Sequence, residues 1–558
     1  MLARLRHIGA LSATRSGVGL GREGGSVWSI AALCIAALAM IPILAIMWAI
    51  PAGGLTAWGH LSASVLPRYA GNTLALMILV GALTASIGAG SAWLVSASRF
   101  PGRKILSWAL VLPLAVPAYI SAYIYADLLD FSGPVQSALR EAFGWGVSDY
   151  WFPAIRSLPG AAFVLSLVLY PYVYLLSRAA FSAQSMSQFR AARTLGLTPA
   201  KAFLRIALPS ARPAIAGGLA LVLMETLADF GVAEFFGVPT FSTGIFRSWL
   251  AMGDKAIALK LAGVMLIFVI VLIAVEAASR KGQVDSKDAV SSDDALIELS
   301  KGRAMAATLA CAVPVMLGFV LPVLTLLGHS LDMGSARDWT ALWTYTKDSL
   351  TLAIIVAVIA SIAALLLAYA QRQSTSRISH AAIRLSTLGY ALPGALLAVG
   401  LLAPLGAFDQ SITRFARDSL GWSGGLILAS TSIILIYALA VRFLTVSFNS
   451  VSAGMDKLPA RMDAAARSLG ATPARVIGRI HLPQLRFSLA AGAALVFIDT
   501  MRELPATLIL RPFNLETLAT RVYRLASDER LAEASTAALV ILALGLIPVM
   551  MLNRAGKR

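Results

Sequence analysis

Twelve long apolar segments constrain this chain more than any other feature of its sequence. A helix that crosses roughly 30 Å of hydrocarbon needs about 20 mostly apolar residues, and each of these segments is close to that length or longer. They are residues 27–50, 70–97, 105–129, 155–177, 213–233, 256–276, 304–328, 349–371, 382–405, 423–446, 488–510 and 531–552. The sequence therefore predicts an all-α polytopic membrane protein with about 12 transmembrane helices.

The distribution of charge agrees with this prediction. Only 13% of the residues are charged, against about 25% in soluble domains, which argues against an ordinary soluble enzyme. With the N-terminus in the cytoplasm, 31 of the 46 Lys and Arg residues fall on the inner side of the membrane. Because this bias sets orientation, we predict a multi-pass membrane protein with both termini cytoplasmic. The net charge of +18 then needs no nucleic acid partner. The first segment is expected to be an uncleaved anchor.

The chain also repeats itself. Residues 191–212 (the first repeated loop) and 465–486 (the second repeated loop) match at a constant offset of 274, with 13 of 22 positions identical. Each loop lies between the fourth and fifth apolar segments of its half. We predict two parallel six-helix domains, residues 1–279 and 304–558, joined by a polar cytoplasmic linker at 280–303. A parallel repeat of this kind places a pathway on the axis between its halves.

Each repeated loop has the pattern of a turn followed by a short helix. A glycine suited to the left-handed conformation precedes a Thr-Pro pair, which is typical of a helix N-terminus. A Leu-Pro pair then predicts the end of that helix before the next span. The result is a short helix on the inner face with one apolar side to bury. It either rests on lipid headgroups or docks on a partner, and its duplication favours a paired or dimeric partner.

The repeated loops resemble the cytoplasmic signature of ABC importer permeases, which reads Glu-Ala-Ala, three residues, Gly, nine residues, Ile, one residue, Leu-Pro. The matching residues are Ala191, Ala192, Gly196, Ile206, Leu208 and Pro209 in the first loop, and Ala465, Ala466, Gly470, Ile480, Leu482 and Pro483 in the second. The acidic position holds Arg190 and Ala464, with Asp463 one residue earlier. The resemblance implies the type I ABC importer permease fold and a location in the bacterial inner membrane. It also implies that these residues, with Pro199 and Pro473, couple the chain to an ATPase.

The resemblance extends over the whole chain, and it is to the fused, double-length permeases for ferric iron. Residues 225–231, 499–507 and 517–523 carry this more specific likeness. It implies two copies of a separate cytoplasmic ABC ATPase, which bind ATP and Mg, and a periplasmic or other extracytoplasmic substrate-binding protein. The chain has no Gly-rich phosphate loop ending in Gly-Lys-Ser/Thr. We therefore expect no enzyme activity and no cofactor in this chain.

Acidic residues in and beside the fifth span of each half are the candidates for the translocation pathway. A charge inside the bilayer costs roughly 2.5–3.5 kcal/mol on insertion scales and is usually functional or paired. The acids correspond at the offset of 274, as Glu225 with Asp499 and Asp229 with Glu503. The alternative is that they form structural salt bridges with Arg247, Arg502 or Arg521. No His/Cys cluster indicates a metal site.

These features predict a permease subunit that forms the translocation pathway for ferric iron, a hard cation that prefers oxygen ligands such as carboxylates. A permease for thiamine or a polyamine is the alternative, since Phe230, Phe235 and Phe236 lie near the acids and offer cation–π contacts. A secondary transporter also has twelve spans in two parallel halves. It has no ATPase to engage, so the repeated loops favour the ABC importer.

Overall fold

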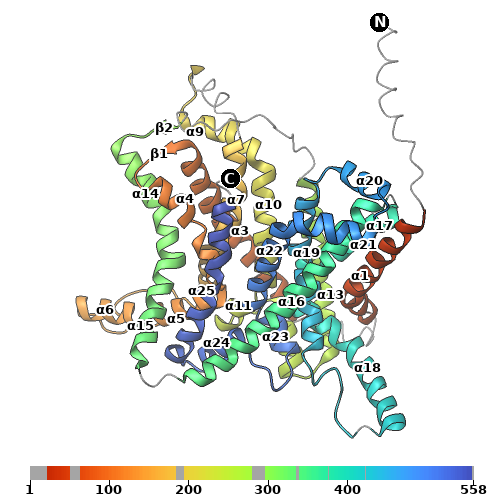
Figure 1. Ribbon diagram of the computed structural model, residues 1–558. Coiled ribbons are helices and arrows are strands. Elements are labelled where there is room, and N and C mark those ends of the chain that lie inside the picture. The colour runs from red at the N-terminus through yellow and green to blue at the C-terminus, as the bar shows by residue number, and fades with distance from the viewer. Residues whose placement is uncertain are drawn as a thin grey trace.

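The computed structural model shows a bundle of long helices (Figure 1). It describes residues 22–50, 59, 63, 65–183, 194–279, 296–334, 338–374, 376–421 and 423–555. The long helices of the first half are α1 (Arg22–Ala49), α3 (Leu66–Ala97), α7 (Leu158–Ala183), α10 (Leu208–Ala228) and α13 (Lys255–Ser279). Those of the second half are α14 (Lys301–Val315) with α15 (Leu321–Asp332), α16 (Trp339–Gln373), α18 (Gly394–Leu420), α19 (Ile433–Met455), α22 (Leu482–Met501) and α25 (Leu531–Ala555).

Shorter helices connect these spans or lie at their ends. In the first half they are α4 (Arg103–Ala109), α5 (Ala118–Leu129), α6 (Pro134–Phe143), α9 (Pro199–Ala202), α11 (Gly231–Phe235) and α12 (Phe241–Phe246). In the second half they are α17 (Arg377–Ser386), α20 (Ala460–Ser468), α21 (Pro473–Val476), α23 (Pro505–Leu510) and α24 (Leu518–Ser527). The all-α polytopic prediction is confirmed.

The number of spans is close to the predicted twelve. Within the described residues, 10 helices are long and apolar enough to cross a membrane. The predicted third span is a helix pair, Arg103–Ala115 and Ala118–Phe143, bent by 93°. Pro117 lies at this bend and is the N-cap of α5, where a proline removes no helical hydrogen bond. The predicted twelfth span corresponds to α25, whose described apolar stretch, Leu531–Ile547, is shorter than the others.

Each half has the same three-helix centre. In the first half α3, α7 and α10 pack on one another, and in the second half α16, α19 and α22 do the same. Small residues allow this close approach, as they do between membrane helices generally. A Cβ atom added at Gly88 of α3 would lie 2.8 Å from the carbonyl oxygen of Tyr170 on α7. The offset of 274 found in the sequence thus relates equivalent helices.

The first helix of each half packs against the other half. Helix α1 contacts α16, α17 and α18, and α14 contacts α3 and α4. Gly400 of α18 lies against α1, because a Cβ atom there would be 2.7 Å from the carbonyl oxygen of Pro42. One continuous hydrophobic core includes residues of both halves. The two repeats therefore form a single packed bundle.

The repeated loops lie at one end of the bundle. In Figure 1, α9 and the α20–α21 region lie at the top, whereas α24 and part of α18 lie at the bottom. Two-residue strands β1 (Ser98–Arg99) and β2 (Ile297–Glu298) pair in parallel at the same upper end. Most of the predicted linker, residues 280–295, falls outside the described residues. Helix α14 begins at Lys301, three residues before the predicted start of the second domain.

One prediction about the loops is wrong. The Leu-Pro pairs were expected to end the short loop helices, but the helix runs on from α9 into α10 and from α21 into α22. A five-residue π turn precedes each proline, at Phe203–Ala207 and at Ile477–His481. A proline removes one backbone donor and disturbs the turn before it. The wider π turn accommodates this disturbance without breaking the helix.

Candidate functional site

All four predicted pathway acids line one cavity between the two halves. Its walls come from α5, α7 and α10 with the segment after α10, and from α19, α22 and the segment after α22. Its volume of about 140 Å³ is many times the roughly 10–15 Å³ that one water requires. Because charged groups line the cavity, it is a place where water or a hydrated solute is stable. The fifth spans thus bring Glu225, Asp229, Asp499 and Glu503 together, as their spacing predicts.

The two acids of the second half are ion-paired. Asp499 accepts a hydrogen bond of 2.6 Å from Arg502, and Arg502 also donates to the backbone carbonyl of Leu114. Glu503 pairs with Arg442 at 2.9 Å, and its side chain is only 3% exposed. Glu503 also caps α23, because it accepts hydrogen bonds from the backbone N–H groups of residues 506 and 507. Both acids of the second half therefore form salt bridges, as the alternative interpretation of the sequence proposes.

The two acids of the first half have hydrogen bonds but no ion pair within the described residues. The hydroxyl of Tyr390 donates to Glu225 at 3.1 Å. Asp229 accepts a hydrogen bond of 3.0 Å from the backbone N–H of Ala233 and so caps α11. Asp229 and Glu503 therefore share a capping role at equivalent positions, but of the two only Glu503 has a cationic partner among the described residues.

Sequence reasoning did not identify every residue of this cavity. It missed Arg442, although an arginine within the predicted span at 423–446 is itself a signal of function. It also missed Tyr119, Tyr172 and Tyr390, which line the cavity. Tyrosine is common enough in membrane helices that no pattern distinguishes these three.

The other arginines named as partners lie elsewhere. Arg247 pairs with Glu234 at 3.0 Å, and Arg521 lies over the ring of Tyr345. Among the residues that the structure describes, no three His, Cys, Asp or Glu side chains are placed to hold a metal ion together. The acidic side chains of the cavity are therefore not arranged as a chelating site of three or more such ligands within the described residues.

The repeated loops have the predicted turn geometry. Gly196 and Gly470 have φ angles of +86° and +78°, in the left-handed region that favours glycine. The hydroxyls of Thr198 and Thr472 accept hydrogen bonds from the backbone N–H groups of residues 201 and 475, as N-caps do. Ala191 and Ala192 lie outside the described residues.

The remaining loop residues differ in exposure. Exposed residues are Gly196, Pro209, Ala465, Gly470, Pro473, Leu482 and Pro483; half-buried residues are Ile206, Leu208 and Ile480; Ala466 is buried. Pro199 begins α9.

The apolar sides of the loop helices face inward. Ala202 is fully buried and packs with Trp93 and with Ile297 of β2. Val476 is 1% exposed at the position equivalent to Ala202. Two large apolar side chains point outward instead: Leu195 is 84% exposed and Leu469 is 87% exposed. They occupy equivalent positions, each one residue before the left-handed glycine, so each loop presents the same leucine–glycine turn at its surface.

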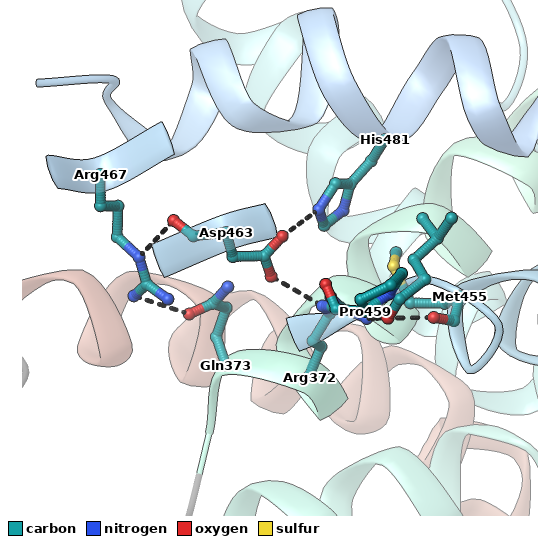
Figure 2. A network of polar contacts seen from close by, with 8 residues as sticks. Arg372, Gln373, Met455, Pro459, Asp463, Arg467 and His481 are labelled. Atoms are coloured by element: carbon teal, nitrogen blue, oxygen red, sulfur yellow. Dashed lines mark hydrogen bonds and ion pairs between the residues drawn. The ribbon is translucent and has the colours of Figure 1, made fainter. Parts of the chain in front are cut away.

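A buried ionic network fixes the second repeated loop to the helices beneath it (Figure 2). Asp463 of α20 is 3% exposed and accepts hydrogen bonds from Arg372 at 2.7 Å and from His481 at 2.8 Å. Arg372 also donates to the backbone carbonyls of Met455, Leu458 and Pro459. Burial alone would raise the pKa of Asp463, but the hydrogen bonds from Arg372 and His481 outweigh it, and the pKa lies below its ordinary value of 3.8.

The first half has a different attachment. The residues equivalent to Arg372 and His481 are Ser98 and Ala207, which carry no charge. Phe203 instead packs on Trp93, with 5.0 Å between ring centroids. Asp463, one residue before the signature's acidic position, thus has a structural partner set that only the second half provides.

Comparison with known proteins identifies relatives of this chain. Residues 77–280 match the family model described as binding-protein-dependent transport system inner membrane component. The chain is 25% identical over 490 residues to the Fe(3+)-transport system permease protein FbpB 2 of Haemophilus influenzae, covering 87% of this chain and 89% of that protein. It is 29% identical to the sulfate transport system permease protein CysT of Salmonella typhimurium over 28% of this chain and 56% of that protein. The putative 2-aminoethylphosphonate transport system permease protein PhnV of the same organism is 26% identical over 47% of this chain and 98% of its own length.

Proposed function

The chain belongs to the family of binding-protein-dependent transport system inner membrane components, as a double-length ABC importer permease, and we propose that its central cavity is the translocation pathway for ferric iron. One observation supports this substrate above the rest. Among the described residues, four carboxylates and two arginines line the cavity, so its formal charge is negative. A cation gains from such a cavity, whereas an anion is repelled.

The charge argument separates iron from the substrates named for other relatives. Sulfate and 2-aminoethylphosphonate appear in the names of CysT and PhnV, and both solutes carry anionic groups. The guanidinium groups of Arg442 and Arg502 are each bonded to a carboxylate, so the positive charge of each is already compensated. FbpB 2, which is named for Fe(3+), matches over most of both chains. Ferric iron is a hard cation, and carboxylate oxygens are the ligands that hard cations prefer.

An organic cation such as thiamine or a polyamine is the second candidate, because aromatic side chains also line the cavity. Phe230 and Phe443 lie on its wall with the three tyrosines. Phe235 and Phe236, which the sequence suggested as well, are not among the lining residues. Cation–π contacts contribute about 0.5–2 kcal/mol each. The two candidates make opposite predictions in a transport assay.

We further propose that the repeated loops dock on two copies of a cytoplasmic ABC ATPase, which binds ATP and Mg, and that an extracytoplasmic protein delivers the substrate. The paired, exposed leucines Leu195 and Leu469 support this proposal. Exposed apolar side chains at equivalent places on one face suit a partner with two equivalent pockets. A secondary transporter, the candidate from another class, gives no reason for such a pair.

The orientation can be tested by labelling single cysteines in a variant whose Cys34 and Cys311 are replaced by alanine. Ser300 and Ser148 are both exposed. Ser300 lies directly before α14, and Ser148 lies after α6. If the repeated loops face the cytoplasm, Ser300→Cys should react with a membrane-impermeant maleimide only after the cells are permeabilised. Ser148→Cys should react in intact cells. The reverse pattern would place the loops outside and contradict ATPase docking.

The substrate can be tested by uptake of radiolabelled ferric iron. Cells that express the permease with its ATPase and binding protein should accumulate iron, and cells that lack only the permease should not. Parallel assays with labelled thiamine and labelled sulfate serve as controls for the two other substrate classes. Permease-dependent thiamine uptake without iron uptake would replace ferric iron with the organic cation. Permease-dependent sulfate uptake would overturn the charge argument.

A further inference from the structure

The two halves contribute unequally to the charge of the central cavity. In the second half each acid is bonded to an arginine, as Asp499 to Arg502 and Glu503 to Arg442. At the offset of 274, the residues equivalent to Arg502 and Arg442 are Ala228 and Val168, and both line the same cavity. The second half is therefore electrically balanced within its own wall, and the negative charge of the cavity comes from Glu225 and Asp229.

Neither first-half acid is neutralised by the hydrogen bonds it accepts. Glu225 accepts one bond from a tyrosine hydroxyl, and Asp229 is bonded to backbone N–H groups at the start of α11. A carboxylate has about four acceptor positions, so both groups, which line the cavity, retain unused acceptor positions. An unpaired carboxylate at this depth is costly unless a cation or water compensates it.

A separate feature of the same wall indicates a ligand. Tyr119 lines the cavity and is 6% exposed, yet its hydroxyl has no hydrogen-bond partner among the described residues. Buried polar groups in folded proteins nearly always have a partner. The Cβ atom of Tyr119, at the other end of the side chain from the hydroxyl, packs against Gly231, two residues after Asp229.

We infer that Glu225 and Asp229 form the cation-binding side of the cavity, with the Tyr119 hydroxyl as a neutral oxygen ligand, and that the paired acids of the second half form a structural wall. The ligand is a hard multivalent cation that keeps part of its water shell, since no three acids converge on one point in the described structure. Such partial coordination lets the ion enter and leave, which conduction requires. This inference rests on the proposed function, whose ferric ion is one such cation.

The first experiment introduces into the first half an arginine that can compensate an acid, as Arg442 does in the second half. Val168→Arg places an arginine where the second half has Arg442, so that it can pair with Asp229. Uptake of radiolabelled ferric iron should fall at least about tenfold, because the site then carries a compensating charge. Val168→Met, of similar length and without charge, is the matched control and should stay within about twofold of wild type. Equal uptake by the two variants would overturn the inference.

The second experiment does not depend on transport or on tolerance of an added arginine. Terbium(III), a hard trivalent cation whose luminescence is excited through nearby tyrosine, is titrated into the purified full-length protein. Glu225→Gln combined with Asp229→Asn should weaken its binding at least about tenfold, since both charges are lost. Asparagine still caps α11. Arg442→Met combined with Glu503→Gln should weaken it by no more than about threefold, because neutral replacement of a buried pair is often tolerated.

The outcomes separate this inference from the proposed substrate. Terbium binding that falls equally in both double variants would show that the halves contribute alike and would overturn the inference. Terbium binding that depends on Glu225 and Asp229, in a protein that transports no iron, would support the cation site but contradict ferric iron as the substrate. Absence of terbium binding to the wild-type protein would remove the site itself.

Discussion

Replacing Gly470 with proline should abolish ferric iron uptake while the chain still reaches the membrane at its normal level. Gly470 has a φ angle of +78°, and its N–H donates to the carbonyl of Arg467 at 2.9 Å. Proline fixes φ near −65° and has no N–H, so the turn between α20 and α21 cannot form. The spans should still insert, because their apolar length is unchanged. The exposed Leu469 would lose its position beside the turn, and docking of the ATPase would fail.

Two further variants separate backbone conformation from bulk in this experiment. In the part of the chain that the structure describes, no atom lies within 4 Å of a Cβ atom added at Gly470 or at Gly478. Gly470→Ala therefore carries only the cost of a left-handed residue, about 1–2 kcal/mol, and should reduce uptake partially. Gly478→Ala, in the same loop but with an ordinary φ angle, should transport normally. Uptake and co-purification of the ATPase are both measured, and a Gly470→Pro variant that still transports would contradict the coupling role.

The spans and the repeat were predictable because both are one-dimensional patterns. A run of apolar residues has a length that can be compared with the bilayer, and an offset of 274 needs no structure to be seen. The packing of α1 against the second half and of α14 against the first half was not predictable. An apolar helix surface shows that it is buried in lipid or protein, but it does not show which bundle covers it. The sequence did not predict that α21 continues into α22, because a proline usually ends a helix. No sequence pattern indicated the π turn.

The candidate site was partly predictable for a related reason. Charged residues in apolar spans are conspicuous, so Glu225, Asp229, Asp499 and Glu503 stood out. Their pairing was not, because a partner such as Arg442 lies 61 residues from Glu503 along the chain. The sequence also placed Asp463 next to the signature's acidic position without indicating that it would be buried. That burial depends on Arg372 and His481, which come from two other helices.

Replacing Asp463 with asparagine should release the second repeated loop from the bundle and strongly reduce uptake. The carboxylate joins α20 to Arg372 of α16 and to His481 at the start of α22, and both partners are themselves largely buried. Breaking a buried pair by removing one partner typically costs about 3–5 kcal/mol, since the other charge is left uncompensated. The Asp463→Asn variant should therefore show a lower thermal midpoint and faster proteolysis in the loop. Asp456→Asn, an exposed acid at the end of α19, is the matched control and should behave as wild type.

The same network makes a prediction about pH. The pKa of Asp463 is lower in the folded protein than its ordinary value of 3.8. The carboxylate therefore stabilises the fold fully above that ordinary value, and its contribution is lost as the pH falls through the lower folded value. The thermal midpoint of the wild-type protein should exceed that of Asp463→Asn by a constant amount near neutral pH, and the difference should shrink as the pH falls below 3.8. A difference that stays constant into this acid range would show that Asp463 acts through packing alone and not through its charge.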